Sequence, residues 1–151
     1  MIEVAIGLGV TFSLIFHEVF GLAAGGIVVP GYIALYFHDP FRLAGTLIVA
    51  LCTWVVIRII SQFVFVYGRR RMVIAVLVGF VFGYFSRQIF ASGGDIFGGQ
   101  LEAIGYIIPG LIANWMERQG VYKTITTVLM AGAMVRVMVI VVSGGQLLGN
   151  I

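Results

Sequence analysis

A proline-glycine pair interrupts two apolar segments of this chain at matching positions. The sequence Gly26-Ile-Val-Val-Pro30-Gly31-Tyr-Ile-Ala34 recurs in the second half of the chain as Gly105-Tyr-Ile-Ile-Pro109-Gly110-Leu-Ile-Ala113. Proline removes a backbone N–H donor, and glycine permits conformations that other residues resist. Non-helical backbone is tolerated at membrane depth only where protein or a water-filled cavity covers it. Paired breaks in corresponding halves therefore indicate the functional centre of a membrane protein.

The composition indicates an integral membrane protein. The chain has 151 residues, of which 61% are hydrophobic and 10% are charged, whereas soluble domains carry roughly 25% charged residues. We expect a single membrane domain over residues 1–151, with no separate soluble domain. The net charge of +3 comes without an extended basic surface, so nucleic-acid binding is not indicated. The single cysteine, Cys52, cannot form an internal disulfide.

Six apolar segments follow one another along the chain, at residues 2–16, 19–37, 43–66, 72–90, 101–116 and 121–142. A spanning helix needs about 20 residues, so the third, fourth and sixth segments are long enough. The second and fifth contain the Pro-Gly pairs, and we expect each to form two half-helices joined near the break. The predicted fold is an all-α membrane protein with two repeats, each about half of the chain, at residues 1–68 and 72–142. Each repeat holds two helices and one broken helix.

The basic residues help to decide whether the broken segments cross the membrane or re-enter. The cluster Arg69, Arg70 and Arg71 is expected on the cytoplasmic side. If both broken segments cross, Arg118 and Lys123 join this cluster inside, as the positive-inside rule favours. The chain then crosses six times, with both termini outside. Three crossings in each half make the two repeats inverted, as in many transporters.

Two arginines lie inside apolar runs at nearly equivalent positions of the two repeats. Arg58 follows Pro30 at almost the same distance along the chain as Arg136 follows Pro109. An arginine at the bilayer centre costs roughly 2.5–3.5 kcal/mol on insertion scales. One interpretation is a path or site for an anion. The alternatives are snorkelling to lipid headgroups, or pairing with a carboxylate or a backbone carbonyl.

The remaining polar residues point to no catalytic or metal site. His17 and Glu18 open the first broken segment, and Glu102 opens the second. A carboxylate at a helix N-terminus is favoured by the helix macrodipole, so these residues are interpreted as caps or, alternatively, as proton- or cation-coupling groups. The sequence contains no zinc-ligand spacing, Walker loop, Gly-x-Ser-x-Gly motif or Cys-His pair, so we predict no catalytic residue and no metal.

Three sequence blocks together resemble one known family, at residues 24–32, at 67–71, and at 107–114 followed by Gln119-Gly120. Their order and spacing resemble the PgsC/CapC family of poly-γ-glutamate (capsule) biosynthesis over nearly the whole chain. The resemblance implies a multi-pass subunit of the bacterial inner membrane. Its partners would be an ATP-dependent amide ligase and a membrane-anchored accessory protein. ATP and a divalent metal would bind to the ligase, and this chain would bind no cofactor.

The resemblance gives the unusual residues specific expected roles. Poly-γ-glutamate carries one free carboxylate per unit, so a path for it needs cations and backbone donors. These are expected from Arg58, Arg136, Pro30, Gly31, Pro109 and Gly110. A second set would contact the ligase or anionic lipid, namely Tyr67, Arg69, Arg70, Arg71, Arg118 and Lys123. One chain of six helices is too small to enclose a wide pore, so self-association or assembly with partners is expected.

Three other functions compete with a subunit that supports polymer synthesis and export. The chain could be an independent small transporter or ion channel built on the repeats. It could be a structural anchor that recruits the ligase. A membrane-embedded enzyme is the weakest candidate, because no nucleophile–base pair or metal set can be assembled from these residues.

Overall fold

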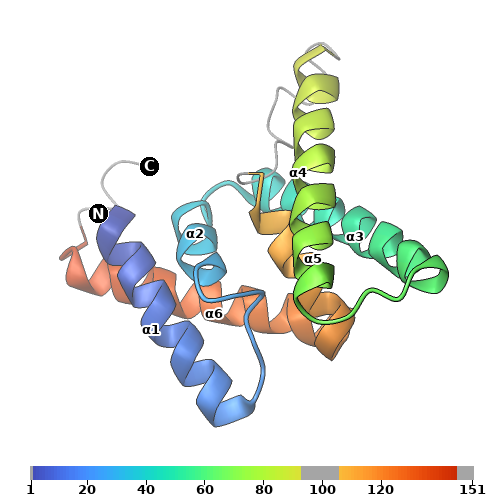
Figure 1. Cartoon of the computed structure of the whole chain (residues 1–151). Coiled ribbons are helices and arrows are strands. Elements are labelled where there is room, and N and C mark those ends of the chain that lie inside the picture. Colours follow the sequence, from blue (N-terminus) through green and yellow to red (C-terminus); the bar gives the residue numbers. More distant parts are fainter. Residues whose placement is uncertain (1, 93–105, 146–151) are drawn as a thin grey trace.

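The computed structural model describes residues 2–92 and 106–145, and these ranges contain helices and no strand. Figure 1 shows their arrangement. The helices are α1 (Ile2–Phe20), α2 (Val29–Leu35), α3 (Pro40–Phe63), α4 (Arg69–Ser92), α5 (Ile108–Gln119) and α6 (Val121–Val142). Every predicted apolar segment contributes one helix, and the all-α prediction is confirmed for the described residues.

The two Pro-Gly pairs lie at helix starts, not in the middle of a helix. Pro30 and Pro109 each occupy the first turn of their helix, where the missing N–H is not needed and the fixed φ is suitable. Residues 21–28 before α2 are non-helical, with Gly25 and Gly26 at φ 74° and 129°. Residues with a Cβ atom rarely adopt such positive φ values, whereas glycine does so readily. The prediction of two half-helices joined at Pro30-Gly31 is therefore wrong, because helix exists only after the break.

Two other helix boundaries differ from the sequence-based prediction. Helix α1 continues through His17 and Glu18 to Phe20 and ends at Gly21, whose φ is 63° and whose N–H bonds to the His17 carbonyl. This is a common way to end a helix. Helix α4 begins at Arg69, so the arginine triplet forms its first turn and not a loop between helices.

The first broken segment runs antiparallel along α1 for most of its length. In the C-terminal half of α1, the Ser13 hydroxyl donates to the Gly26 carbonyl at 3.1 Å. In the middle of the helix, Gly31 lies against Gly9. Near the N-terminal end, Ala34 packs in one buried cluster with Ala5. The segment therefore returns from one end of α1 toward the other, and does not fold back where it started.

The second broken segment runs along α4 in the same way. Tyr106 lies beside Gly83, and Gly110 lies against Gly79. Ala113 packs in one buried cluster with Ala75. The order of these contacts is antiparallel, so α5 ends near the N-terminal end of α4.

Both broken segments approach the preceding helix at backbone-to-backbone distance. A Cβ atom built on Gly9 would lie 2.5 Å from the Cα of Gly31. A Cβ atom built on Gly79 would lie 2.6 Å from the Cα of Gly110. Real Cβ atoms do not come this close to backbone, so each pair of positions needs glycine. Small residues allow the same close packing between membrane helices in general.

The long helices α3 and α6 pack across the halves of the chain. Helix α2 lies against α1 and α6, whereas α5 lies against α4 and α3. One buried cluster contains Ala5, Ala34 and Val135, and another contains Ile57, Ala75 and Ala113. Each cluster therefore draws on three different helices, one of which comes from the other half of the sequence.

The central core forms around α2 and α5. It contains Val29 and Ile33 from α2 with Ile108 and Ile112 from α5, together with residues of α3 and α6. The α2 residues and the α5 residues stand at equivalent positions relative to Pro30 and Pro109. Both helices that follow a break are thus covered on several sides by protein.

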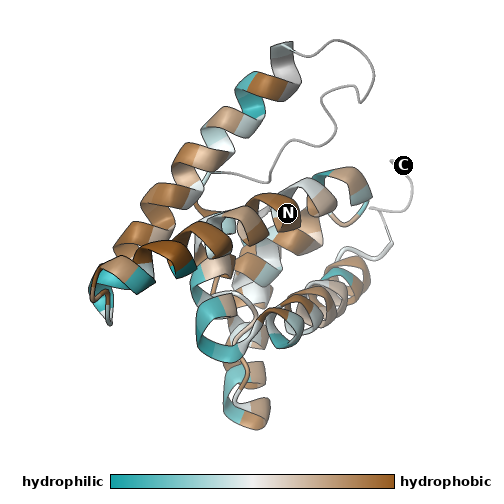
Figure 2. Ribbon diagram, turned by 90° about the vertical axis from the view of Figure 1, so that its right-hand side faces the viewer, coloured by the Kyte–Doolittle hydropathy of each residue, from teal (hydrophilic) through white to brown (hydrophobic). Residues whose placement is uncertain are grey.

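Four of the helices in the described residues present extensive apolar surface to the outside. By length and composition, α1, α3, α4 and α6 could each cross a membrane. Figure 2 shows hydrophobic residues along most of the ribbon and hydrophilic residues mainly near helix ends and connections. Exposed hydrophobic side chains include Leu77, Phe85 and Val137, each more than half exposed. This surface is suited to lipid and not to water.

Two glycines on α1 allow a matched test of the close approach. We expect Gly9→Ala to lower the stability of the purified protein by about 1–3 kcal/mol, because the new Cβ meets the backbone of Gly31. Gly7→Ala is the control, since a Cβ there meets nothing within 4 Å and helix propensity favours alanine. Thermal unfolding in detergent measures the difference. Equal melting temperatures for the two variants would contradict the packing described.

Candidate functional site

A glutamine side chain fastens the first non-helical segment to the other half of the chain. The Gln119 side-chain amide donates to the Ala23 carbonyl at 2.7 Å, and the Ala23 N–H donates to Gln119 Oε1 at 3.1 Å. The same amide group donates to the Thr124 hydroxyl at 3.1 Å. Gln119 thus supplies the hydrogen bonds to the Ala23 N–H and carbonyl that a helix would have made with other backbone groups. It also places the C-terminal end of α1 beside the α5–α6 junction.

These contacts bring five basic side chains to one end of the molecule. Gln119 joins the α1 terminus to the α5–α6 junction, and the antiparallel course of α5 along α4 adds the N-terminal end of α4. In Figure 1 these three parts lie toward the bottom of the view. We call this the basic end, and it carries Arg69, Arg70, Arg71, Arg118 and Lys123. Arg42 and Arg87 lie toward the opposite end.

Most side chains of the basic end are open to the surroundings. Arg69, Arg70, Arg118 and Lys123 are exposed, and Tyr67 is 73% exposed. The Arg118 guanidinium lies over the Trp115 ring at 5.4 Å. Such a contact holds the side chain in place while leaving its charge accessible. The first turn of α4 is also the positive end of its dipole, so the three arginines there add to its positive charge.

The two intramembrane arginines have different surroundings. Arg136 is half-buried, and its Nη1 donates to the Ala34 carbonyl at 3.2 Å. Ala34 belongs to the last turn of α2, where carbonyl groups lack helical partners and a cation is favourable. Arg136 is therefore attached to the C-terminal end of the helix that follows the first break.

Arg58 is exposed on α3, and its guanidinium lies over the ring of Trp54 at 5.3 Å. Trp54 is one turn earlier on the same helix. Among the described residues, no carboxylate is close enough to pair with Arg58. The sequence placed Arg58 and Arg136 at equivalent positions, but in the structure Arg58 is exposed, whereas Arg136 is half-buried and bound to a backbone carbonyl.

The expected capping role of His17 and Glu18 is wrong. Both residues lie in the last turns of α1 and not at the start of a helix, so the macrodipole disfavours the Glu18 carboxylate there. His17 instead meets the Trp115 ring edge-on, with the centroids 6.3 Å apart. A coupling role for these residues stays a prediction. Glu102 lies outside the described residues.

A small cavity of about 150 Å³ adjoins the first break. It lies between α1, the non-helical segment and α5, and it is lined by Ser13, Leu14, His17, Ala23, Gly26, Ile27 and Trp115. No group of three or more histidine, cysteine, aspartate or glutamate side chains that could hold a metal ion occurs within residues 2–92 and 106–145. The lining is mainly apolar, and Ser13, His17 and Trp115 are the lining residues with polar side-chain atoms.

Comparison with known proteins identifies the family. The family model "Capsule biosynthesis CapC" matches residues 8–125. The chain belongs to the CapC family. It is 39% identical over 138 residues to "Capsule biosynthesis protein CapC" of Bacillus anthracis, covering 89% of this chain and 91% of that protein. It is 36% identical over 137 residues to "PGA biosynthesis protein CapC" of Bacillus subtilis (strain 168), with the same shares covered. No solved structure matches the chain.

The CapC match covers most of the features described above. The span 8–125 contains both Pro-Gly breaks, Arg58 and the whole basic end. Arg136 lies beyond it. The family resemblance deduced from the three sequence blocks is thus confirmed, while the roles expected for the individual residues of this CapC chain stay predictions.

Sequence reasoning missed two polar contacts of this CapC chain. Gln119 was part of a recognised block, and its place just before the helix-ending Gly120 was a signal that it could reach another segment. Ser13, which binds the Gly26 carbonyl, gave no signal of its own. Its partner is backbone, and backbone exposed by non-helical structure cannot be located before the structure is known.

The unequal surroundings of the arginines predict unequal effects on stability. Arg136→Gln removes a charged donor from the Ala34 carbonyl, and we expect a loss of about 1 kcal/mol. Arg58→Gln is the matched control, because Arg58 contacts only a surface ring of its own helix. We expect its stability to change by less than about 0.5 kcal/mol. Denaturation of the purified variants measures both, and a reversed order would contradict these assignments.

Proposed function

We propose that this chain is a membrane subunit of a poly-γ-glutamate synthase in the bacterial inner membrane. It would support ATP-dependent polymerisation by a partner ligase and export of the anionic polymer. The family match over residues 8–125 carries this proposal. Two relatives that align over nearly their whole length support it, since one is named for capsule and the other for PGA biosynthesis. The four long apolar helices support the membrane location.

We infer that the chain consists of two inverted repeats related by a pseudo-two-fold axis between α2 and α5. The two buried clusters correspond, because each joins the alanine after a Pro-Gly break to an alanine of the preceding helix, Ala34 to Ala5 and Ala113 to Ala75. The close approach of Gly9 to Gly31 likewise corresponds to that of Gly79 to Gly110. Three membrane passages in each repeat would place equivalent groups at opposite depths.

The charge distribution supports a cytoplasmic location for the basic end. Five basic residues lie there, whereas Arg42 and Arg87 lie toward the other end. Positive residues in short connections favour the cytoplasmic side. The antiparallel course of both broken segments supports six crossings instead of re-entry. Both termini would then face outward.

In this arrangement, Arg58 is the cation best suited to meet the polymer. Its side chain is exposed near the cytoplasmic third of α3, and it pairs with no carboxylate within the described chain. Each glutamate unit brings one carboxylate that an arginine can bind. Arg136 would act indirectly, by holding α2 and the first break in position. Because Arg58 faces outward, the polymer path would form between copies of the chain or against a partner.

The basic end would also be the contact site for the ligase and the membrane-anchored accessory subunit. Arg69 and Arg70 are exposed on the first turn of α4, and Tyr67 stacks on Phe65 next to them. Exposed arginine and tyrosine side chains are enriched in protein interfaces. ATP and its divalent metal would bind to the ligase, which agrees with the absence of nucleotide-binding motifs in this sequence.

Cysteine accessibility tests the proposed topology. In a Cys52→Ala background, Arg42→Cys should react in intact cells with a thiol reagent that cannot cross membranes, because residue 42 lies toward the outer end. Arg118→Cys should react only after the cells are permeabilised, which also controls for its reactivity. Labelling of position 118 in intact cells would rule out six crossings with the basic end inside.

Polymer synthesis tests the function itself. Membranes that contain the ligase and this chain should make polymer from ATP and glutamate. We expect Arg58→Gln to give less or shorter polymer while the complex stays intact, since the cation that meets carboxylates is lost. Arg42→Gln is the control, because this arginine lies toward the opposite end, over the Tyr36 ring.

The other outcomes of this experiment are equally informative. Unchanged polymer with Arg58→Gln would exclude the proposed polymer contact. If neutral substitutions at Arg69 and Arg70 then abolished binding of the ligase, the chain would be a structural anchor. A lack of polymer with the unmodified chain and an active ligase would contradict the proposed function.

A further inference from the structure

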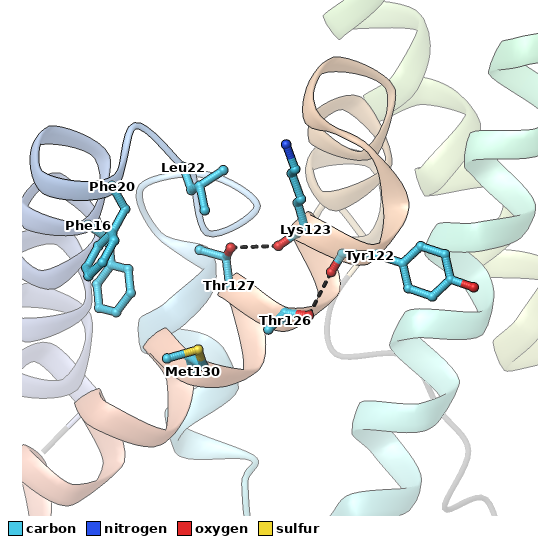
Figure 3. A pocket seen from close by; sticks show the side chains of 8 residues that line it. All are labelled: Phe16, Phe20, Leu22, Tyr122, Lys123, Thr126, Thr127 and Met130. Carbon is cyan, nitrogen blue, oxygen red and sulfur yellow. Dashed lines mark hydrogen bonds between the residues drawn. The ribbon is translucent and has the colours of Figure 1, made fainter.

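An apolar groove follows the seam between α1 and α6. Its first part is a pocket of about 310 Å³ (Figure 3), which begins at Phe20 and Lys123 and extends to Met130. Its second part is a shallow pocket of about 320 Å³ between Phe12 and the stretch of α6 from Ala133 to Met138. The residues of both parts recur every three or four positions, so each helix contributes one continuous face.

Large apolar side chains form the walls of this groove. Phenylalanines recur at every fourth position on α1 and methionines at every fourth position on α6, namely Phe12, Phe16, Phe20, Met130, Met134 and Met138. We call this surface the Phe–Met groove. Methionine adapts its shape to irregular apolar partners. Membrane helices, in contrast, pack against each other mainly through small residues, so the walls are better suited to a hydrocarbon chain than to another helix.

The threonine hydroxyls inside the groove are already occupied. The Thr126 hydroxyl donates to the Tyr122 carbonyl at 2.8 Å, and the Thr127 hydroxyl donates to the Lys123 carbonyl at 2.6 Å. Figure 3 shows both bonds along the α6 backbone, and it shows the Tyr122 ring directed away from the pocket. The groove therefore offers hydrocarbon surface along its length, and its threonines have no free donor that would select a polar ligand.

Lys123 supplies a positive charge at the basic end of the groove. Its side chain is exposed, and the described residues provide no carboxylate in contact with it. In Figure 3 its amine extends beside Leu22, at the mouth of the pocket and away from the groove floor. A ligand that fits both features has an apolar chain and an anionic head group.

We propose that the Phe–Met groove binds one anionic phospholipid of the cytoplasmic leaflet, with an acyl chain in the groove and its phosphate at Lys123. The proposal rests on the membrane orientation inferred above. From Lys123 to Met138, α6 rises roughly 22 Å, and one leaflet of the hydrocarbon core measures about 15 Å. The groove is therefore long enough for a chain that starts at the cytoplasmic surface.

The equivalent seam of the other half lacks these residues. With the offset that relates Arg136 to Arg58, the counterpart of Lys123 is Gly45 and the counterpart of Met130 is Cys52. A positive charge at the mouth and methionines in the wall are thus particular to the α1–α6 seam.

Lipid binding to the purified full-length chain tests the proposal. Native mass spectrometry would compare phosphatidylglycerol with phosphatidylcholine of the same acyl chains. We expect phosphatidylglycerol to bind about fivefold more tightly, since one lysine near the membrane surface contributes roughly 1 kcal/mol. Lys123→Gln should remove this preference, and Lys123→Arg should retain it. Arg42→Gln, at the opposite end, should leave it unchanged.

A second variant tests the groove itself. Met130→Trp fills the pocket between α1 and α6 and should weaken binding of both lipids, while the melting temperature without added lipid shows whether the fold is intact. Equal binding of both lipids to the unmodified chain, or a preference that survives Lys123→Gln, would overturn the proposal. A partner's helix that remains bound in the groove and excludes lipid would also overturn it. The assay contains no ligase, so its failure is distinguishable from failure of the proposed function.

Discussion

The contact between each Pro-Gly break and the backbone of the preceding helix is the interaction on which the rest of the structure depends. Gly9 with Gly31, and Gly79 with Gly110, let two chain segments meet without intervening side chains. This contact fixes the antiparallel course of each broken segment, and thereby the end of the molecule that each connection reaches. The gathering of the basic residues at one end follows from that course.

The sequence predicted the parts of the fold that depend on local chemistry. The apolar segments and the sixth helix, Val121–Val142, were predicted. The sequence could not show that Gly25 and Gly26 keep the chain non-helical before Pro30, because an apolar glycine-containing stretch is compatible with helix and with extended backbone. The backbone conformation of this stretch depends on distant residues, because Gln119 in the second half of the chain pairs with Ala23 in the first.

The two arginines show how far sequence symmetry can be used to assign function. Their positions correspond, and the expectation that both face an anion path treated them as one site. The structure separates them, because Arg136 reaches the Ala34 carbonyl while Arg58 lies over Trp54 on its own helix. Pairing with a backbone carbonyl was one of the alternatives to an anion path, and it describes Arg136. A side chain's partner depends on the neighbouring helix, which periodicity along one chain does not identify.

The exchange of long helices between the halves has a consequence for synthesis of the protein. Helix α2 and the break before it are covered by α6, which is synthesised after the other described helices. During translation, the backbone around Gly25 and Gly26 is therefore in the membrane or translocon before α6 is available to pack against it. The first half cannot complete its own packing, so the chain is expected to reach its native structure only after both halves have been inserted.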